Sequence, residues 1–144
     1  MITPLTGNEM NFYDLLLPEN PGTVVMDGKE YIWNTWGEIL NPPADAQVWA
    51  TYKNEFYEGS PAVTFRKLGK GTITYVGVDS HNGALEKDIL KKLYVQLNIP
   101  VMDLPYGVTM EYRNGLGIVL NYSDQPYTFN LSKGCLLYTS DAAD

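Results

Sequence analysis

The sequence has little cysteine, histidine or positive charge. Its 144 residues include one cysteine, Cys135, and one histidine, His81, and 17 acidic residues outnumber 10 basic ones. A single cysteine cannot form a disulfide within the chain, and a single histidine excludes a histidine-based metal cluster. The net charge of -7 argues against a nucleic-acid surface. We therefore expect no nucleic-acid partner, no metal site and no cofactor.

Long apolar runs are also missing. No apolar stretch approaches the roughly 18 residues that a membrane-spanning helix needs, and the first residues lack the basic-then-apolar pattern of a secretory signal. With 44% hydrophobic and 19% charged residues, the composition is ordinary for a protein with one core. We expect no membrane partner.

The clearest local pattern is a pair of strands. Residues 61–68 and 72–78 are rich in Val, Ile, Thr, Tyr and Phe, and glycines flank the reversal between them. We predict a β-hairpin with a turn at Gly69-Lys70-Gly71. Its second strand is the more apolar and should be the more deeply buried.

Residues 84–97 show a regular helical pattern. The apolar positions recur every four residues, at Leu85, Ile89, Leu93 and Leu97. One face of this helix should therefore pack against a sheet. Asn82 is the predicted N-cap. A strand that runs into such a helix is typical of an α/β layer architecture.

Two dipeptide turns indicate further hairpins. Asp27-Gly28 separates the predicted strands 23–26 and 30–33, and Asn114-Gly115 separates 108–113 from 116–122. A third strand at 127–131 would complete an antiparallel meander, which is small and is therefore predicted to be truncated.

Two segments near the amino terminus are less regular. Residues 47–52 form another predicted strand. The apolar cluster at 12–17 is too short to distinguish a helix from a strand.

Several short groups of residues resemble one enzyme family by their order and spacing. They are Ala50-Thr51-Tyr52, Phe56-Tyr57, Gly59, Pro61-Ala62-Val63-Thr64, Gly69-Lys70-Gly71 and Tyr75-Val76-Gly77. Together they resemble the end of the trimerisation domain of family 42 glycoside hydrolases, the bacterial β-galactosidases. Tyr106-Gly107-Val108 and Leu120-Asn121-Tyr122-Ser123-Asp124 are similar to the small C-terminal β domain of the same enzymes. The resemblance covers residues 36–131.

This resemblance implies a fold, a domain plan and a function. The fold would be α/β, with the C-terminal part of a Rossmann-like, amidotransferase-like trimerisation domain at 1–103 and a truncated antiparallel β meander at 104–134. The parent would be a cytoplasmic enzyme that hydrolyses terminal β-D-galactosides in a barrel upstream of this chain and assembles as a homotrimer. The fragment itself would be non-catalytic and serve subunit assembly. An amidotransferase activity would need a cysteine nucleophile, which the sequence before Cys135 lacks.

Spacing and resemblance disagree for residues 31–40. Trp33, Trp36 and Leu40 have helical spacing, whereas the matching stretch of the family is extended. We predict an extended segment that ends at Pro42-Pro43, because proline cannot donate a backbone hydrogen bond.

The last ten residues resemble the translation of a sequencing-library transposase adapter. We interpret residues 135–144, which include Cys135, as an adapter-derived artefact. A natural C-terminal tail is the alternative.

A retaining glycosidase would need two carboxylates about 5 Å apart. The candidates are Glu30, Glu38, Glu55, Glu58, Glu86, Asp88 and Glu111. Glu55 and Glu58 flank Phe56-Tyr57 in a predicted loop, the pairing most like a sugar site, although a solvated loop with tucked aromatics is the favoured interpretation. Because the family's catalytic pair belongs to the barrel and no position here matches either motif, we assign no catalytic residue.

Two other groups resemble catalytic motifs. Asp79-Ser80-His81 has the residue types of a hydrolase triad, but adjacent residues do not converge on one line of hydrogen bonds, so we predict a capping loop. Gly69-Lys70-Gly71-Thr72 resembles part of a phosphate loop, yet it joins strand to strand instead of strand to helix.

Aromatic residues leave a second hypothesis open. They make up 12% of the chain, with tryptophans at positions 33, 36 and 49, and we expect core positions first, an interface second and sugar contacts third. The aromatics between Tyr52 and Tyr57 suggest the alternative to an assembly fragment, a free-standing carbohydrate-binding or protein-interaction module.

Overall fold

The computed structural model of the chain describes residues 3–129. The chain divides into two units, residues 1–101 and 102–144. The first holds a seven-stranded sheet and the second a two-stranded sheet. None of the helices between residues 3 and 129 has the length and apolarity to cross a membrane. The predicted adapter-derived tail at 135–144 lies outside the described residues.

Two predicted hairpins of the first unit are confirmed. β2 (Gly22–Met26) pairs with β3 (Lys29–Asn41) through a turn in which Asp27 and Gly28 both have positive φ, as a type I′ turn requires. β5 (Pro61–Leu68) pairs with β6 (Gly71–Val76) through Gly69-Lys70. The predicted order of burial is wrong, because four residues of β5 are buried whereas those of β6 are half-buried or exposed. β4 (Gln47–Lys53) lies between the two hairpins in the sheet.

β3 confirms the extended interpretation of residues 31–40. Tyr31 and Trp33 are buried while Ile32 between them is exposed, which is the alternation of a strand. Thr35 then has a φ of 75°, and the pairing of β3 is irregular between Trp33 and Gly37. This irregularity interrupts the period of two, so the tryptophans acquire a spacing that resembles a helix.

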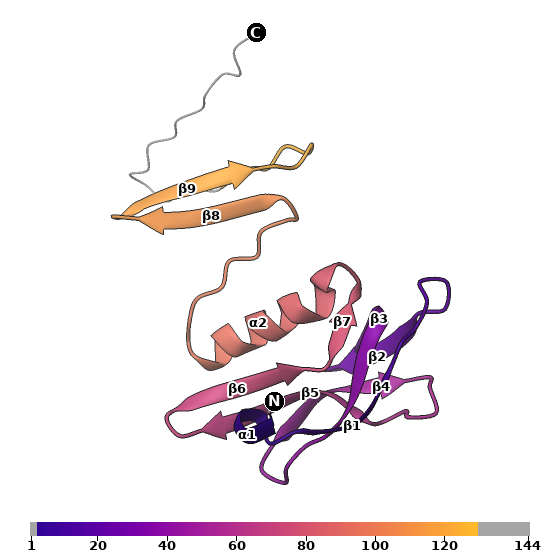
Figure 1. Cartoon of the computed structure of the whole chain (residues 1–144). Helices are drawn as coiled ribbons and strands as arrows, with labels where there is room; N and C mark the ends of the chain where they lie inside the picture. The colour runs from indigo at the N-terminus through magenta and orange to yellow at the C-terminus, as the bar shows by residue number, and fades with distance from the viewer. Residues whose placement is uncertain (1–2, 130–144) are drawn as a thin grey trace. The chain divides into compact units, whose positions relative to one another are not determined.

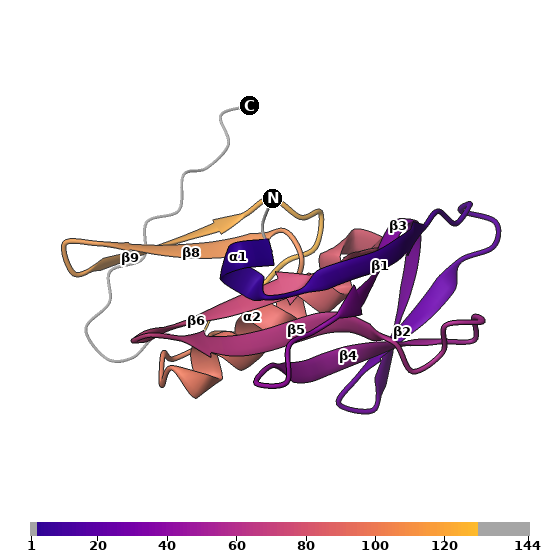
Figure 2. The same ribbon diagram turned by 60° about the horizontal axis from the view of Figure 1, so that its bottom comes forward.

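The sheet has a linear strand order, and one further strand, β7 (Val78–Ser80), pairs with β3 inside that order (Figures 1 and 2). The strand order is β1-β3-β2-β4-β5-β6, and β1 (Glu9–Asp14) adds to the second half of β3. After β6 the chain continues through Gly77 into β7, which pairs back with β3. Gly77 donates to the carbonyl of Ala62 at 2.9 Å, and its own carbonyl accepts from the N–H of Glu38 at 2.6 Å. This glycine therefore links β5 to β3 and closes the ring of strands.

The predicted α/β, Rossmann-like fold class is wrong. Every strand pair is antiparallel, and the described residues contain one helix longer than four residues. The arrangement is a β sandwich in which one helix covers part of the sheet. An α/β layer needs a parallel strand after the helix. Here the chain leaves α2 for the second unit without another strand of this sheet.

The predicted helix is confirmed as α2 (Ala84–Gln96). Leu85 and Ile89 are buried in the core, and Leu93 packs against it. The prediction is wrong for Leu97, which is the C-cap residue and is 55% exposed. Its N-cap is Gly83, not the predicted Asn82, because Asn82 lies in the short 3-10 turn His81–Gly83 (η1) with a φ of 57°. The Ser80 hydroxyl instead accepts the free N–H of Leu85 at 3.0 Å. A four-residue helix, α1 (Thr3–Thr6), precedes β1.

The core forms around an aromatic pair. The rings of Trp33 and Tyr52 meet edge to face at 5.5 Å, and both side chains are at most 1% exposed. Gly22 and Gly37 make room for this indole, since a Cβ at either position would lie within 2.8 Å of Trp33 ring atoms. Burying side chains of this size dominates the stability of a small sheet.

The second unit is a single described hairpin. β8 (Val108–Arg113) and β9 (Leu116–Asn121) pair through Asn114-Gly115, where both φ angles are positive, as predicted. Of the third predicted strand, residues 127–129 are described and form no strand, and 130–131 lie outside the described residues. A lone hairpin is marginally stable in water.

Candidate functional site

An open hollow of about 310 Å³ lies where β6 passes into β7. Its lining comes from β3, from the β6–β7 segment and from the first turn of α2, with the residues Trp36, Glu38, Val76, Gly77, Val78, Asp79 and Glu86. The ring closure at Gly77 brings these elements together. Small-molecule sites start at about this volume, so the hollow is the candidate site.

The Glu38 carboxylate is held from two sides. It accepts a hydrogen bond from the Tyr75 hydroxyl and a second from the indole N–H of Trp36 at 3.3 Å. Burial, together with the hydrogen bond to Glu38, raises the pKa of Tyr75 to about 12. Tyr75 thus remains a neutral donor at neutral pH, and Glu38 serves as an acceptor.

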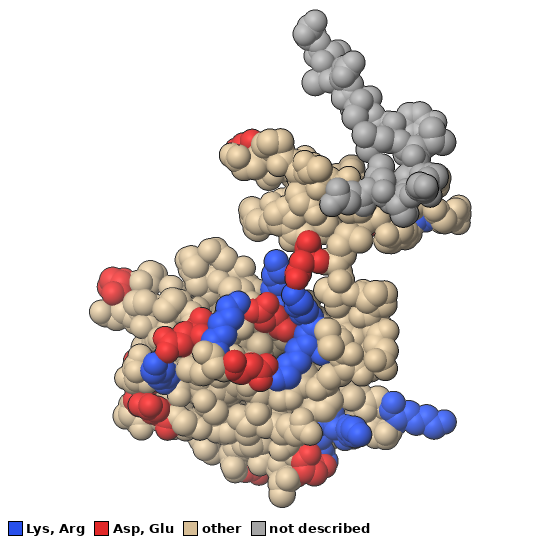
Figure 3. All heavy atoms as spheres, turned by 180° about the vertical axis from the view of Figure 1, so that it is seen from behind, with Lys and Arg blue, Asp and Glu red and all other residues tan. Residues whose placement is uncertain are grey.

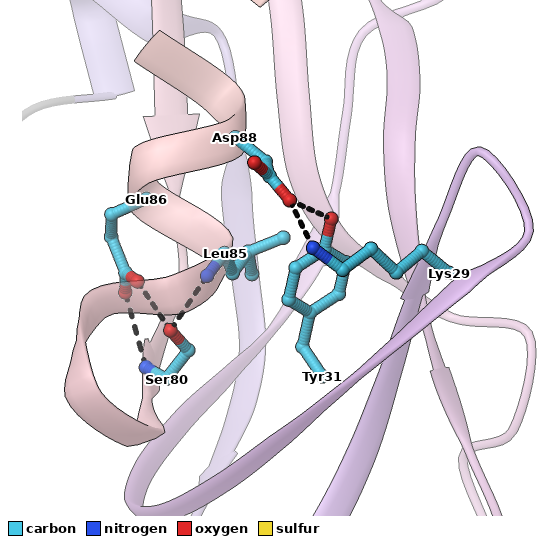
Figure 4. A network of polar contacts seen from close by, with 6 residues as sticks. All are labelled: Lys29, Tyr31, Ser80, Leu85, Glu86 and Asp88. Carbon is cyan, nitrogen blue, oxygen red and sulfur yellow. Dashed lines mark hydrogen bonds and ion pairs between the residues drawn. The ribbon is translucent and has the colours of Figure 1, made fainter. Parts of the chain in front are cut away.

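The Glu86 carboxylate is fixed by Ser80 (Figure 4). It accepts from the Ser80 hydroxyl and, at 3.1 Å, from the Ser80 backbone N–H. Because that hydroxyl is committed to Glu86 and to the Leu85 N–H, it is not aligned with Asp79 and His81. The predicted capping role is confirmed for Ser80, whose hydroxyl accepts the Leu85 N–H, but Asp79 and Ser80 lie on strand β7 and not in the predicted loop.

Trp36 is the aromatic residue among those that line the hollow. Tyr13 on β1 stacks on Trp36 with ring centroids 4.7 Å apart and planes 11° apart. Trp36 is 39% exposed, whereas Trp33 and Trp49 are buried in core positions. Phe12 stacks on Phe56 at 5.6 Å. One of the three tryptophans is therefore available to a ligand.

The loop that suggested a sugar site does not present its aromatics. Tyr52 and Tyr57 are 1% and 5% exposed, and only Phe56 is open to solvent, at 86%. The Tyr57 hydroxyl donates to Asp14 at 2.6 Å. Glu55 and Glu58 lie in the turn between β4 and β5, where the Glu58 N–H donates to the Glu55 carbonyl. The predicted loop with tucked aromatics is confirmed for Tyr57 and is wrong for Phe56, whose side chain lies in solvent.

The remaining candidate carboxylates are dispersed. Glu30 pairs with Lys53 and Asp88 pairs with Lys29, each at 2.5 Å, and Asp88 also accepts from the Tyr31 hydroxyl at 2.8 Å (Figure 4). Glu111 is on β8 of the second unit. The structure thus gathers Glu38, Asp79 and Glu86, a set distributed over three elements. Only the i, i+2 spacing of Trp36 and Glu38 on one strand could have pointed to it from sequence.

Within residues 3–129, no group of three or more His, Cys, Asp or Glu side chains is arranged to hold a metal ion. The Gly69-Lys70-Gly71-Thr72 segment joins two strands as a hairpin turn. On the face shown in Figure 3, acidic and basic side chains are interspersed and form no field of a single sign.

The outward side of α2 is apolar. Leu90, Tyr94 and Leu97 follow one another at helical spacing and are 53%, 45% and 55% exposed. The opposite side of the helix is anchored to the sheet by Lys92, which pairs with Asp27 at 2.7 Å. α2 therefore carries two apolar faces, and the residues of its own unit cover one of them. We call residues Leu90, Tyr94 and Leu97 the α2 stripe.

Comparison with known proteins identifies the relatives of the chain. The family model described as the β-galactosidase trimerisation domain matches residues 1–105. The β-galactosidase LacA of Lactobacillus acidophilus is 38% identical over 73 residues, which are 51% of this chain and 11% of that protein. The β-galactosidase BgaB of Geobacillus sp. is 30% identical over 107 residues, 71% of this chain and 16% of that protein.

Solved structures share the fold. The β-galactosidase of the haloarchaeon Halorubrum lacusprofundi matches with a TM-score of 0.74 and 28% identity, over 85% of this chain and 18% of that one. The cold-adapted β-galactosidase of Rahnella sp. R3 matches with a TM-score of 0.71 and 27% identity, over 84% and 20%. The chain thus spans 11% to 20% of the length of these relatives. Since the family model matches most of its length, the chain belongs to the trimerisation domain family of the family 42 β-galactosidases.

Proposed function

We propose that this chain is a non-catalytic, C-terminal part of a β-galactosidase and that it serves subunit assembly. The parent enzyme would hydrolyse terminal β-D-galactosides in a barrel that precedes this chain, and three copies would associate. The family description, trimerisation domain, supports self-association. The small share of each relative that the chain spans supports a catalytic site elsewhere in the parent.

The observation that carries the proposal is the α2 stripe. Three large apolar side chains on one side of a well-anchored helix are each about half exposed. Contiguous exposed apolar patches mark protein–protein interaction sites. The neighbouring anchor residues of α2, Lys92 and Asp88, pair with the sheet and hold the stripe in place for a second copy.

Analytical ultracentrifugation of the full chain tests this role. We expect concentration-dependent self-association that Leu90→Glu with Leu97→Glu abolishes, because two charges at an apolar contact are desolvated without partners. Leu17→Glu, at a residue 62% exposed outside the stripe, is the matched control and should associate normally. A strictly monomeric chain at high concentration, or equal loss in the control, would contradict the assembly role.

The absence of catalysis needs its own measurement. Glu38 and Glu86 line the same hollow. If the chain had glycosidase activity of its own, these two carboxylates would be the candidates for its catalytic pair. We expect the purified chain to leave a chromogenic β-galactoside intact. Turnover that disappears in Glu38→Gln and Glu86→Gln would show that the chain is itself a glycosidase.

We further propose three properties that rest on the sequence alone. They are the domain boundaries 1–103 and 104–134, the adapter origin of 135–144 and a cytoplasmic location. The same ten residues after an unrelated domain would establish the adapter origin. A free-standing carbohydrate-binding module loses the support of the loop at Tyr52–Tyr57, because both tyrosines are buried.

A further inference from the structure

We propose that the hollow between β3, the β6–β7 segment and α2 binds a neutral pyranose sugar, with Trp36 as the stacking surface and Glu38 and Glu86 as acceptors for its hydroxyl groups. This inference rests on the geometry of the hollow and does not depend on the assembly role of the α2 stripe.

Trp36 is held in a fixed orientation before any ligand arrives. Tyr13 covers one face of the indole at 4.7 Å, and the indole N–H donates to Glu38 at 3.3 Å. The ring nevertheless remains 39% exposed and lines the hollow. A rigid aromatic surface binds at a low cost in conformational entropy, and its flat apolar face suits the C–H face of a sugar ring.

The two carboxylates retain acceptor capacity. An ionised carboxylate offers about four lone-pair sites. Glu38 uses two of them, for Tyr75 and Trp36, and Glu86 uses two for Ser80. These contacts fix both side chains and leave sites for further donors. Because their present partners include hydroxyl groups, sugar hydroxyls are donors of a matching kind.

The charge of the lining disfavours anionic ligands. It contains no Lys or Arg, so phosphate, sulfate and uronic acids would meet only negative charge. An organic cation is the remaining competitor, yet sites for such cations enclose the charge with several aromatic faces, and Trp36 is the one aromatic residue of this lining. A volume of about 310 Å³ suits one sugar ring better than an oligosaccharide.

The test uses the full chain with methyl β-D-galactopyranoside and methyl β-D-glucopyranoside. We expect a saturable change in tryptophan fluorescence, and saturation-transfer NMR signals from the ring protons of the sugar. Trp36→Phe should abolish the fluorescence change while the buried Trp33 and Trp49 remain as an internal background. Glu38→Gln should weaken binding by about tenfold, as the loss of a charged acceptor does. Glu30→Gln, at an exposed carboxylate paired with Lys53, is the matched control and should bind normally.

Three results would overturn the proposal. They are the absence of saturable NMR signals from either sugar with the unsubstituted chain, an unchanged response in Trp36→Phe, and saturation by tetramethylammonium but not by the sugars. The first result needs no variant and therefore stands even if Trp36→Phe fails to fold. Normal self-association with no sugar binding would reject this inference alone and leave the assembly role intact.

Discussion

The hydroxyl of Tyr52 donates a hydrogen bond to the backbone carbonyl of Glu38 at 2.9 Å. Tyr52 lies on β4 and Glu38 on β3, and β2 separates these strands in the sheet. The bond therefore crosses the interior, where the Tyr52 side chain is 1% exposed. It connects the wall of the candidate hollow to the aromatic core.

Tyr52→Phe tests the worth of this bond. The substitution keeps the ring and leaves the partly buried carbonyl of Glu38 without this donor, so we expect the free energy of unfolding to fall by about 1–2 kcal/mol. Urea denaturation followed by circular dichroism measures the change. Tyr106→Phe, at a side chain 97% exposed, should change stability by less than about 0.5 kcal/mol. Equal effects at the two positions would show that the Tyr52 hydrogen bond does not stabilise the core.

The elements that were predictable from sequence are the ones whose causes are local. Asp27-Gly28 and Asn114-Gly115 adopt positive φ angles that few other dipeptides tolerate, so both hairpins follow from two residues each. The four-residue apolar repeat of α2 is equally local. The family resemblance also had a local basis, in short groups of residues between 50 and 77.

The fold class and the hollow have no such local cause. Whether a strand that enters a helix belongs to a parallel or an antiparallel sheet depends on which strand it meets. β7 meets β3 with an antiparallel pairing. The hollow needs Gly77 to bring β3 beside β6 and β7, and Ser80 to turn Glu86 towards it. These are long-range pairings that periodicity cannot encode.

Gly37→Ala should destabilise the core. A Cβ at this position would lie 2.7 Å from the Trp33 ring and 3.0 Å from the Tyr52 hydroxyl, and overpacking of a rigid core costs about 1–3 kcal/mol. Gly71→Ala is the matched control on another strand, since its Cβ would approach only one carbonyl oxygen, at 3.8 Å. Thermal unfolding of both variants makes the comparison. A Gly37→Ala protein as stable as Gly71→Ala would show that the indole can shift.

Asp88→Asn should reduce stability in a pH-dependent way. The hydrogen bond from the Lys29 ammonium, followed by that from the Tyr31 hydroxyl, holds the pKa of Asp88 below its ordinary value. A carboxylate with a depressed folded-state pKa stabilises the fold above the unfolded pKa of about 3.9, and this stabilisation is lost as the pH falls through the folded pKa. For a pair this exposed, the loss at pH 7 should be about 0.5–1 kcal/mol.

Denaturation of the Asp88→Asn variant at several pH values checks this expectation. The difference from the unsubstituted chain should shrink as the pH falls from about 4 through the depressed folded-state pKa of Asp88, below which the residue is protonated in both states. Glu19→Gln, at an exposed residue, should show no such trend. A constant difference across the pH range would mean that the aspartate acts through packing and not through its charge.

Tyr57→Phe should make the free energy of unfolding fall less steeply as the pH rises into the alkaline range. Burial, and then the hydrogen bond to Asp14, raises the pKa of Tyr57 above its ordinary value. A group whose folded-state pKa is raised contributes stability that is present below the unfolded pKa of about 10 and is lost as the pH rises through the folded pKa. The unsubstituted chain should therefore lose stability steeply above about pH 10.

Tyr57→Phe should be less stable at neutral pH, because Asp14 loses its donor, and should lose less of that stability on alkalinisation. Urea titrations on both sides of this pH measure the two slopes, with Tyr106→Phe as the exposed control. Identical slopes in all three proteins would show that Tyr57 does not couple folding to alkaline pH.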